Sequence, residues 1–295
     1  MKNYSIICTC QGFNKDTNVI TQKLNNLCNY VDKNDNNLNI LFVGSFIRHN
    51  DDINIIKTKK CTKILFISEP IEIAPYYFHT LDLYKNNFFD YIIGCTDQFK
   101  YPLYMDIIIY FDKDTFNNIN KRLKSIDIKD KRFCALINTH DTWNTRVPIY
   151  DKIKEFGQID CPSKLLNNCT NEELNSLGNS NYLSKYLFNI CSENTLTNID
   201  GYITEKLVNC CNGGAIPIYC GWFDEIDSKI FNKNRILFFN PNDSKSIDEL
   251  YLKIKNLMEH KNQLKKFYMM DVYMDSAYDT VQKLDLSLMK MFKRL

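Results

Sequence analysis

The sequence predicts an α/β fold in two parts, each with a parallel sheet. Its 295 residues are many for a single domain, so two domains are the natural expectation. Short apolar runs typical of buried strands recur along both parts, and more polar segments of helical length separate them. Between residues 188 and 220, a strand, a short helix and a second strand follow one another, which is the arrangement that connects parallel strands.

The first part contains four apolar runs that we interpret as strands. They cover residues 5–10, 39–45, 63–68 and 90–95. Apolar residues at helical spacing near 17–31 predict an amphipathic helix between the first two strands. A strand, a helix and a second strand at the start of the chain favour a parallel sheet.

The second part repeats this alternation. We expect its strands at residues 133–139, 188–191, 215–220 and 235–239. A helix at 203–211 lies between two of them and ends at Gly213 and Gly214, because glycine readily adopts the left-handed conformation that closes helices. Two helices, at 246–270 and 275–292, complete the chain, and neither contains proline or glycine.

A charged stretch, residues 121–132, lies between the two series of strands. We place the domain boundary in it. The prediction is a first domain at residues 1–128, a second at 129–274 and a terminal helix at 275–295. The two similar halves that this implies show no internal sequence repeat.

Polar side chains gather where the strand at 188–191 is predicted to end. Glu193 and Asn194 follow it directly. In open α/β sheets, ligands bind beyond the carboxyl ends of the strands, and a helix N-terminus there favours anions such as phosphates. Lys206 lies in the first turn of the next helix, where the helix dipole disfavours a cation. An anion bound in front of Lys206 would account for its position.

The composition excludes some classes of protein. With 37 basic and 35 acidic side chains the chain is nearly neutral, so we expect no nucleic-acid partner. The 12 cysteines lie mostly in predicted strands, where they serve as small apolar residues, and none has the spacing of a zinc site. We therefore expect no metal and a reducing compartment.

The hydropathy pattern contains no candidate for a membrane span. No segment approaches about 20 consecutive apolar residues, and the first residues lack the apolar region of a signal peptide. We expect a soluble or cytoplasmic protein.

Three motifs follow one another here: Glu193-Asn194, Tyr202 to Lys206 and Ala215 to Gly221. They resemble motifs of glycosyltransferase family 10, the α-1,3/α-1,4-fucosyltransferases. The family has a strand that ends in Phe-Glu-Asn, then Tyr-Val-Thr-Glu-Lys and, after a helix, Ala-Val-Pro-Ile-Tyr-Trp-Gly. Here Glu193-Asn194, the run 202–206 (YITEK) and the run 215–221 (AIPIYCG) stand in the same order and spacing. The resemblance covers about residues 63–241, and it is specific because the match is long and ordered.

The resemblance implies a fold and an activity. The fold is GT-B, with two Rossmann-like domains facing across a cleft and the last helix packing back on the first domain. The activity is an inverting, metal-independent transfer of L-fucose from GDP-fucose to an oligosaccharide or glycoconjugate acceptor, at O3 of an N-acetylglucosamine-like residue. No cofactor beyond the GDP-fucose donor is implied.

The resemblance also assigns donor-binding residues. The family order of a strand, an Asn, an Arg and then Tyr-Asp is matched by Asn138, Arg146 and Tyr150-Asp151. A guanidinium suits a diphosphate because its planar fork makes bidentate contacts, so Arg146 and Lys206 are the expected phosphate clamps. Asn194 is expected to contact the donor as well.

Three further residues belong to the predicted donor site. Tyr202 is expected one helical turn before Lys206, where its hydroxyl can donate to the same anion. Glu205 is expected to face away from Lys206 and to hold donor hydroxyls. Glu193 could contact the donor or cap the turn that follows its strand.

For the general base the candidate is Glu69, just beyond the predicted strand at 63–68. Glu72 is the alternative base. The structural interpretation of Glu69 is a carboxylate that stabilises a turn. Asp112-Lys113-Asp114 matches the Asp-x-Asp pattern of metal-dependent transferases, but so short a pattern arises often by chance and lies before the predicted boundary, so we reject a metal role for it.

Two departures from the family pattern leave other functions open. Ser192 replaces the Phe before Glu-Asn, and Cys220 replaces the Trp of the last motif. Both are expected near the donor, so one alternative is a GT-B enzyme that uses a different nucleotide sugar. The other is a catalytically inactive protein that binds a nucleotide sugar or a glycan.

Overall fold

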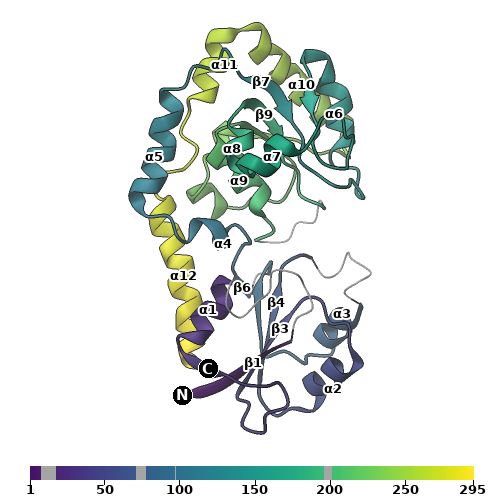
Figure 1. Cartoon of the computed structure of the whole chain (residues 1–295), viewed down its shortest axis with the longest axis vertical. Helices are drawn as coiled ribbons and strands as arrows, with labels where there is room; N and C mark the ends of the chain where they lie inside the picture. The colour runs from purple at the N-terminus through teal and green to yellow at the C-terminus, as the bar shows by residue number, and fades with distance from the viewer. Residues whose placement is uncertain (8–17, 71–77, 97, 196–200) are drawn as a thin grey trace. The chain divides into compact units, whose positions relative to one another are not determined.

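The computed structural model describes residues 1–7, 18–70, 78–96, 98–195 and 201–295. They form two compact units, which we describe separately (Figure 1). Unit 1 contains Met1–Ile109, a short stretch that includes Tyr202, and Val281–Leu295. Unit 2 contains Tyr110–Asn198 and Ile203–Thr280.

Unit 1 is built on a sheet whose described strands are all parallel, in the order β2-β1-β3-β4-β5-β6. The strands are β1 (Lys2–Ile7), β2 (Cys28–Tyr30), β3 (Ile40–Gly44), β4 (Thr62–Ile67), β5 (Tyr91–Gly94) and β6 (Phe99–Lys100). Every residue of the inner strand β3 is buried, as expected for a parallel sheet covered on both faces.

Helices cover this sheet on two sides. They are α1 (Val19–Asn25), α2 (Asn50–Thr58), α3 (Phe78–Lys85), α4 (Met105–Ile108) and the C-terminal part of α12 (Ala277–Arg294). Lys23 of α1 pairs with Asp285 of α12 at 2.6 Å, and α2 and α3 lie on the other side of the sheet (Figure 1).

The first helix is shorter than the predicted one at 17–31. Asn18 caps α1 by accepting from the backbone N–H of Ile20 and Thr21, and the helix ends at Asn25. The residues that follow form β2, which pairs with β1 at the edge of the sheet. Strand pairing therefore overrides the helical spacing of the apolar residues here.

Unit 2 contains a second sheet of parallel strands, in the order β11-β10-β9-β7-β8. Its strands are β7 (Arg132–Ala135), β8 (Ile159–Asp160), β9 (Tyr186–Ile190), β10 (Ile216–Tyr219) and β11 (Leu237–Phe238). The helices of this unit are α5 (Lys113–Lys124), α6 (Val147–Ile153), α7 (Glu172–Leu177), α8 (Asn179–Leu183), α9 (Glu205–Gly213), α10 (Ser244–Glu259) and α11 (Lys261–Tyr268). The central strand β9 is buried throughout.

Much of the charged stretch that we placed at the domain boundary forms α5, which belongs to unit 2. The side-chain amide of Asn120 donates to the carbonyl of Tyr273 at 2.9 Å and accepts from the N–H of Val272 at 2.9 Å. These bonds fasten α5 to the segment before α12. The boundary between the two compact units lies at Ile109/Tyr110, whereas we placed the domain boundary after residue 128.

The helix predicted at 246–270 is two helices. His260 ends α10 and precedes α11, and its ψ of 80° lies outside the helical region, which interrupts the helical ladder. Among the helices that the structure describes, none is both long enough and apolar enough to cross a membrane.

Candidate functional site

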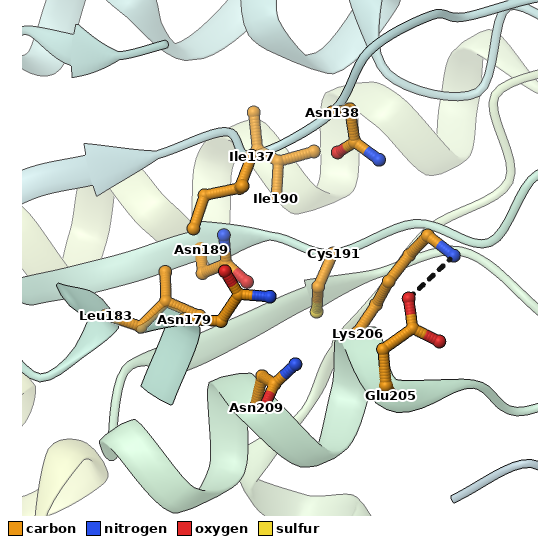
Figure 2. A pocket seen from close by; sticks show the side chains of 10 residues that line it. All are labelled: Ile137, Asn138, Asn179, Leu183, Asn189, Ile190, Cys191, Glu205, Lys206 and Asn209. Carbon is orange, nitrogen blue, oxygen red and sulfur yellow. Dashed lines mark ion pairs between the residues drawn. The ribbon is translucent and has the colours of Figure 1, made fainter. Parts of the chain in front are cut away.

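The carboxyl edge of the unit 2 sheet carries the candidate site. A cavity of about 70 Å³ lies there, between the loop after β7, the end of β9, α8 and the first turns of α9 (Figure 2). Its walls are Ile137, Asn138, Asn179, Leu183, Asn189, Ile190, Cys191, Glu205, Lys206 and Asn209. The predicted strand–helix–strand unit therefore forms a cavity at the edge of the sheet where ligands of open α/β folds bind.

Glu193, just beyond β9, is fully buried and joins that strand to α9. Its carboxylate accepts from the backbone N–H of Thr204 at 2.9 Å and from the hydroxyl of Thr204 at 2.8 Å. The hydroxyl of Tyr219 donates to it at 3.4 Å. Burial raises the pKa of Glu193 above its usual value, and the charge of Lys206 and the bonds from Thr204 offset only part of this rise. These contacts join the end of β9 to Thr204, eleven residues further along the chain.

Lys206 brings a cation to the cavity. Its ammonium lies 3.1 Å from the hydroxyl of Thr204 and 3.4 Å from the carboxylate of Glu193, and its side chain is 19% exposed. Burial lowers the pKa of Lys206, but the charges of Glu193 and Glu205 outweigh it, so the net shift is upward. The side chain is thus held charged and in place at the cavity wall.

Glu205 turns out to lie beside Lys206. Their charged groups are 3.7 Å apart and both side chains line the cavity, as the dashed line in Figure 2 shows. We expected adjacent helical residues to face apart. The expectation is wrong because the long lysine stem can curl back toward the carboxylate of the first helical residue.

Arg146 is buried, with only 1% of its side chain exposed. Its guanidinium donates to the carbonyls of His140 at 3.0 Å and Ser192 at 2.9 Å, and to the side-chain oxygen of Asn194 at 2.9 Å. With the Asn138 amide turned to suit its neighbours, that side chain accepts from Nε at 3.2 Å. Arg146 therefore joins the loop after β7 to the loop after β9.

Three of the predicted donor residues thus form one cluster. Arg146 contacts both Asn138 and Asn194, and Asn194 is half-buried. The hydroxyl of Thr145 adds a bond to the carbonyl of Glu193 at 3.1 Å, which connects this cluster to the Glu193–Lys206 pair.

Asp141 is a residue of the site that the sequence analysis missed. Its carboxylate accepts from the N–H groups of Thr145 at 2.8 Å, Arg146 at 3.0 Å and Val147 at 2.8 Å. It also lies 3.6 Å from the guanidinium of Arg146, and its side chain is 4% exposed. An aspartate shortly before a proline-containing helix start was the available signal, since Asp is a preferred capping residue.

Tyr202 stands apart from this set. It precedes α9, which begins at Glu205, so the predicted relation of one helical turn to Lys206 does not hold. Its ring is buried in the core of unit 1, in the same cluster as Ile67 and Cys95.

The candidate base, Glu69, follows β4 in unit 1 and is half-buried. The alternative base, Glu72, lies outside the described residues. Ser192 and Cys220, the two departures from the family pattern, are buried and do not line the cavity.

The described residues contain no group of three or more His, Cys, Asp or Glu side chains placed to hold a metal ion. Asp112, of the Asp-x-Asp pattern, instead caps α5 by accepting from the N–H of Thr115 at 2.7 Å. No disulfide joins any two of the cysteines that the structure describes.

Comparison with known proteins decides the family. Residues 126–285, just over half of the chain, match the model of glycosyltransferase family 10 (fucosyltransferase) C-term. The chain belongs to glycosyltransferase family 10. The resemblance inferred from the three motifs is confirmed, and the matched range contains every element of the candidate site in unit 2.

A curated fucosyltransferase is similar to this family 10 chain. Helicobacter pylori α-(1,3)-fucosyltransferase FucT is 27% identical over 227 residues, which are 65% of this chain and 44% of that protein. The chain thus spans less than half the length of this curated relative.

Solved structures show the fold. A crystal structure of an α1,3-fucosyltransferase has a TM-score of 0.68 at 16% identity. An α1,3-fucosyltransferase with GDP-fucose has a TM-score of 0.65 at 17% identity. Each match covers 98% of this chain and 90% of the other. The family 10 chain accordingly has the predicted α/β fold of GT-B type, with two Rossmann-like units.

Proposed function

We propose that this family 10 chain transfers L-fucose from GDP-fucose to a hydroxyl of an acceptor glycan, with inversion and without a metal ion. The observation that supports this proposal most directly is the cavity at the start of α9, where buried Glu193 keeps Lys206 charged. Family membership supports the reaction class, and binding of GDP-fucose by a protein of the same fold supports the donor.

The departing diphosphate needs positive charge, and Lys206 is the cation best placed to supply it. Its ammonium already has carboxylate partners at 3.4 and 3.7 Å, distances longer than a tight ion pair. A phosphate oxygen in front of α9 would meet the ammonium and the positive end of the helix dipole together.

In this proposal Arg146 acts chiefly by holding its neighbours in place. Because its donors engage the protein, it fixes Asn194 and the chain at Ser192, and its charge adds to the potential of the site. Asn194 then contacts the donor, and Glu205, whose side chain is 52% exposed, holds donor hydroxyls. We retain Tyr202 as a donor-binding residue only through the family motif.

The reaction is a single displacement. The acceptor oxygen forms a bond to the anomeric carbon of fucose as the bond from that carbon to the diphosphate oxygen breaks. The electron pair leaves with GDP, and the acceptor proton passes to Glu69, the proposed general base. Donor and acceptor are the partners of the protein, and we propose that no cofactor takes part.

Incubation with GDP-fucose and N-acetyllactosamine-type acceptors tests the activity. We expect a fucosylated product with the anomeric configuration opposite to that of the donor, formed equally in the presence of EDTA. Loss of activity in EDTA, restored by a divalent cation, would contradict metal independence alone.

Thermal-shift measurements with a panel of nucleotide sugars separate the alternatives, since the preferred ligand stabilises the fold by mass action. Stabilisation by another nucleotide sugar and not by GDP-fucose would replace the donor in the proposal. Donor binding without transfer or hydrolysis, unchanged in Glu69→Gln, would indicate a binding protein instead.

A further inference from the structure

A second pocket of unit 2 lies at the edge of the sheet opposite the candidate site. It has a volume of about 490 Å³. Lys131 immediately precedes β7, Leu187 is near the start of β9, and both line it together with the start of α11. Amino ends of parallel strands share one edge, so this pocket is separate from the cavity at α9. Its volume is within the range of small-molecule sites.

The pocket carries an excess of positive charge. Lys129, Lys131, Lys261 and Lys265 line it, and among the described residues of its lining Asp127 is the single acidic one. Asp127 already pairs with Lys129 at 3.3 Å. Hydrogen bonds from Lys129 lower the pKa of Asp127, with a smaller contribution from the charge of Lys265. One carboxylate cannot neutralise four ammonium groups.

Burial and a neighbouring cation act against the ionised form of Lys131. It is half-buried, donates to the carbonyl of Ser184 and lies 5.3 Å from the ring centre of Tyr268. Burial lowers the pKa of Lys131, and the charge of Arg122 lowers it further. A bound anion would reverse this trend, because an opposite charge nearby favours the ionised lysine.

The remaining walls are aliphatic. Ile128 and Met258 are half-buried, and Leu187 and Leu264 are buried beneath them. In the part of the chain that the structure describes, no aromatic side chain on which a base could stack lines the pocket. An aliphatic floor with a cationic rim suits an acyl or alkyl chain that ends in an acidic group.

We propose that this pocket binds an amphiphile with an acidic headgroup and an aliphatic chain. The headgroup, a phosphate or carboxylate, lies between the exposed ammonium groups of Lys261 and Lys265. The chain packs against Met258 and Leu264. The inference rests on the pocket alone and is independent of the proposed transfer reaction.

Calorimetric titration of the full chain with dodecyl phosphate, below its micelle concentration, tests this. We expect saturable binding, and binding weakened at least about tenfold in the double variant Lys261→Glu/Lys265→Glu. The double variant Lys290→Glu/Lys293→Glu makes the same charge change on exposed residues of α12 and should bind like the wild type.

Two further ligands separate charge from chain. Dodecyl maltoside has the chain with a neutral head, and inorganic phosphate has the charge without the chain; we expect each to bind at least about tenfold more weakly than dodecyl phosphate. Equal binding of either ligand, or no effect of the Lys261/Lys265 change, would overturn the proposal. Met258→Gln, which keeps the size and removes the apolar contact, should weaken binding of the two dodecyl ligands and leave binding of inorganic phosphate unchanged.

GDP-fucose binding serves as the internal reference in every variant. We expect it to be unchanged, since none of these residues belongs to the cavity at α9. Failure of dodecyl phosphate to bind a protein that still binds GDP-fucose would refute the amphiphile site and leave the proposed function standing.

Discussion

The guanidinium of Arg146 donates to the side-chain oxygen of Asn194 at 2.9 Å, and through this bond the loops after β7 and β9 become one structure. The same guanidinium holds the carbonyl of Ser192, and Asp141 holds the backbone of Arg146. A residue that we expected to grip a ligand directly thus also organises its neighbours.

Arg146→Lys should destabilise unit 2 by about 3 kcal/mol, because a lysine cannot reproduce the fork and leaves buried acceptors and Asp141 poorly paired. Denaturant unfolding followed by tryptophan fluorescence measures it. Arg132→Lys is the matched control, since Arg132 is about half exposed and pairs with Glu173 at the surface; its effect should stay below about 1 kcal/mol. Equal effects of the two changes would contradict a structural role for Arg146.

Glu193→Gln should make donor binding more sensitive to alkaline pH. Burial lowers the pKa of Lys206 and the charge of Glu193 is the largest influence that raises it, so removal of that charge lets the pKa fall. The ammonium then deprotonates at a lower pH, so binding of the phosphate weakens at a lower pH as well. Titration of GDP affinity between about pH 7 and 10 checks this; superimposable profiles of variant and wild type would exclude the coupling.

Gly214→Ala should destabilise the chain by about 2 to 4 kcal/mol. Gly214 caps α9 with a φ of +88°, and a Cβ there would lie 2.2 Å from Cδ2 of Leu123. Gly178→Ala is the control, since its φ is +74° but nothing lies within 4 Å of the added carbon. The control adds backbone strain without the clash, about 1 to 3 kcal/mol, because its ψ of 163° lies in a region essentially confined to glycine. Thermal unfolding of both variants should rank them in that order.

Asp106 gives unit 1 a pH dependence. Burial raises the pKa of this carboxyl from 3.8 to about 6. The folded state therefore favours the protonated form, and the stability from this group is complete below about pH 4 and is lost as the pH rises through 6. Asp106→Asn should raise the free energy of unfolding at pH 7.5 relative to the wild type by about 3 kcal/mol, and the difference should vanish near pH 4. A difference that grows toward acid pH would refute the assignment.

The strand–helix–strand unit from β9 to β10 was predictable because its parts are contiguous: Glu193, Lys206 and Gly214 each act within one local motif. Short strands such as β6 and β8 have two residues each, too few to show a period. Asp141 was missed because its role depends on where the loop after β7 folds.

Tyr202 and the helix predicted at 246–270 show a different limit. The pattern around residues 202–211 does not specify that α9 begins at Glu205, because the cap at Thr204 depends on the buried carboxylate of Glu193. Likewise, nothing as strong as proline or glycine marks the break at His260, which tertiary packing of α10 and α11 imposes.

The central claim, that the cation at the start of α9 binds the donor diphosphate, is tested most directly by GDP affinity of Lys206→Ala, with Lys229→Ala as a control in which an exposed lysine paired to Glu225 is removed. A charge-assisted contact contributes about 2 kcal/mol, so calorimetry should show GDP binding weakened by roughly thirtyfold in Lys206→Ala and unchanged in the control. Equal affinity of Lys206→Ala and the wild type for GDP, with the variant folded, would contradict the account.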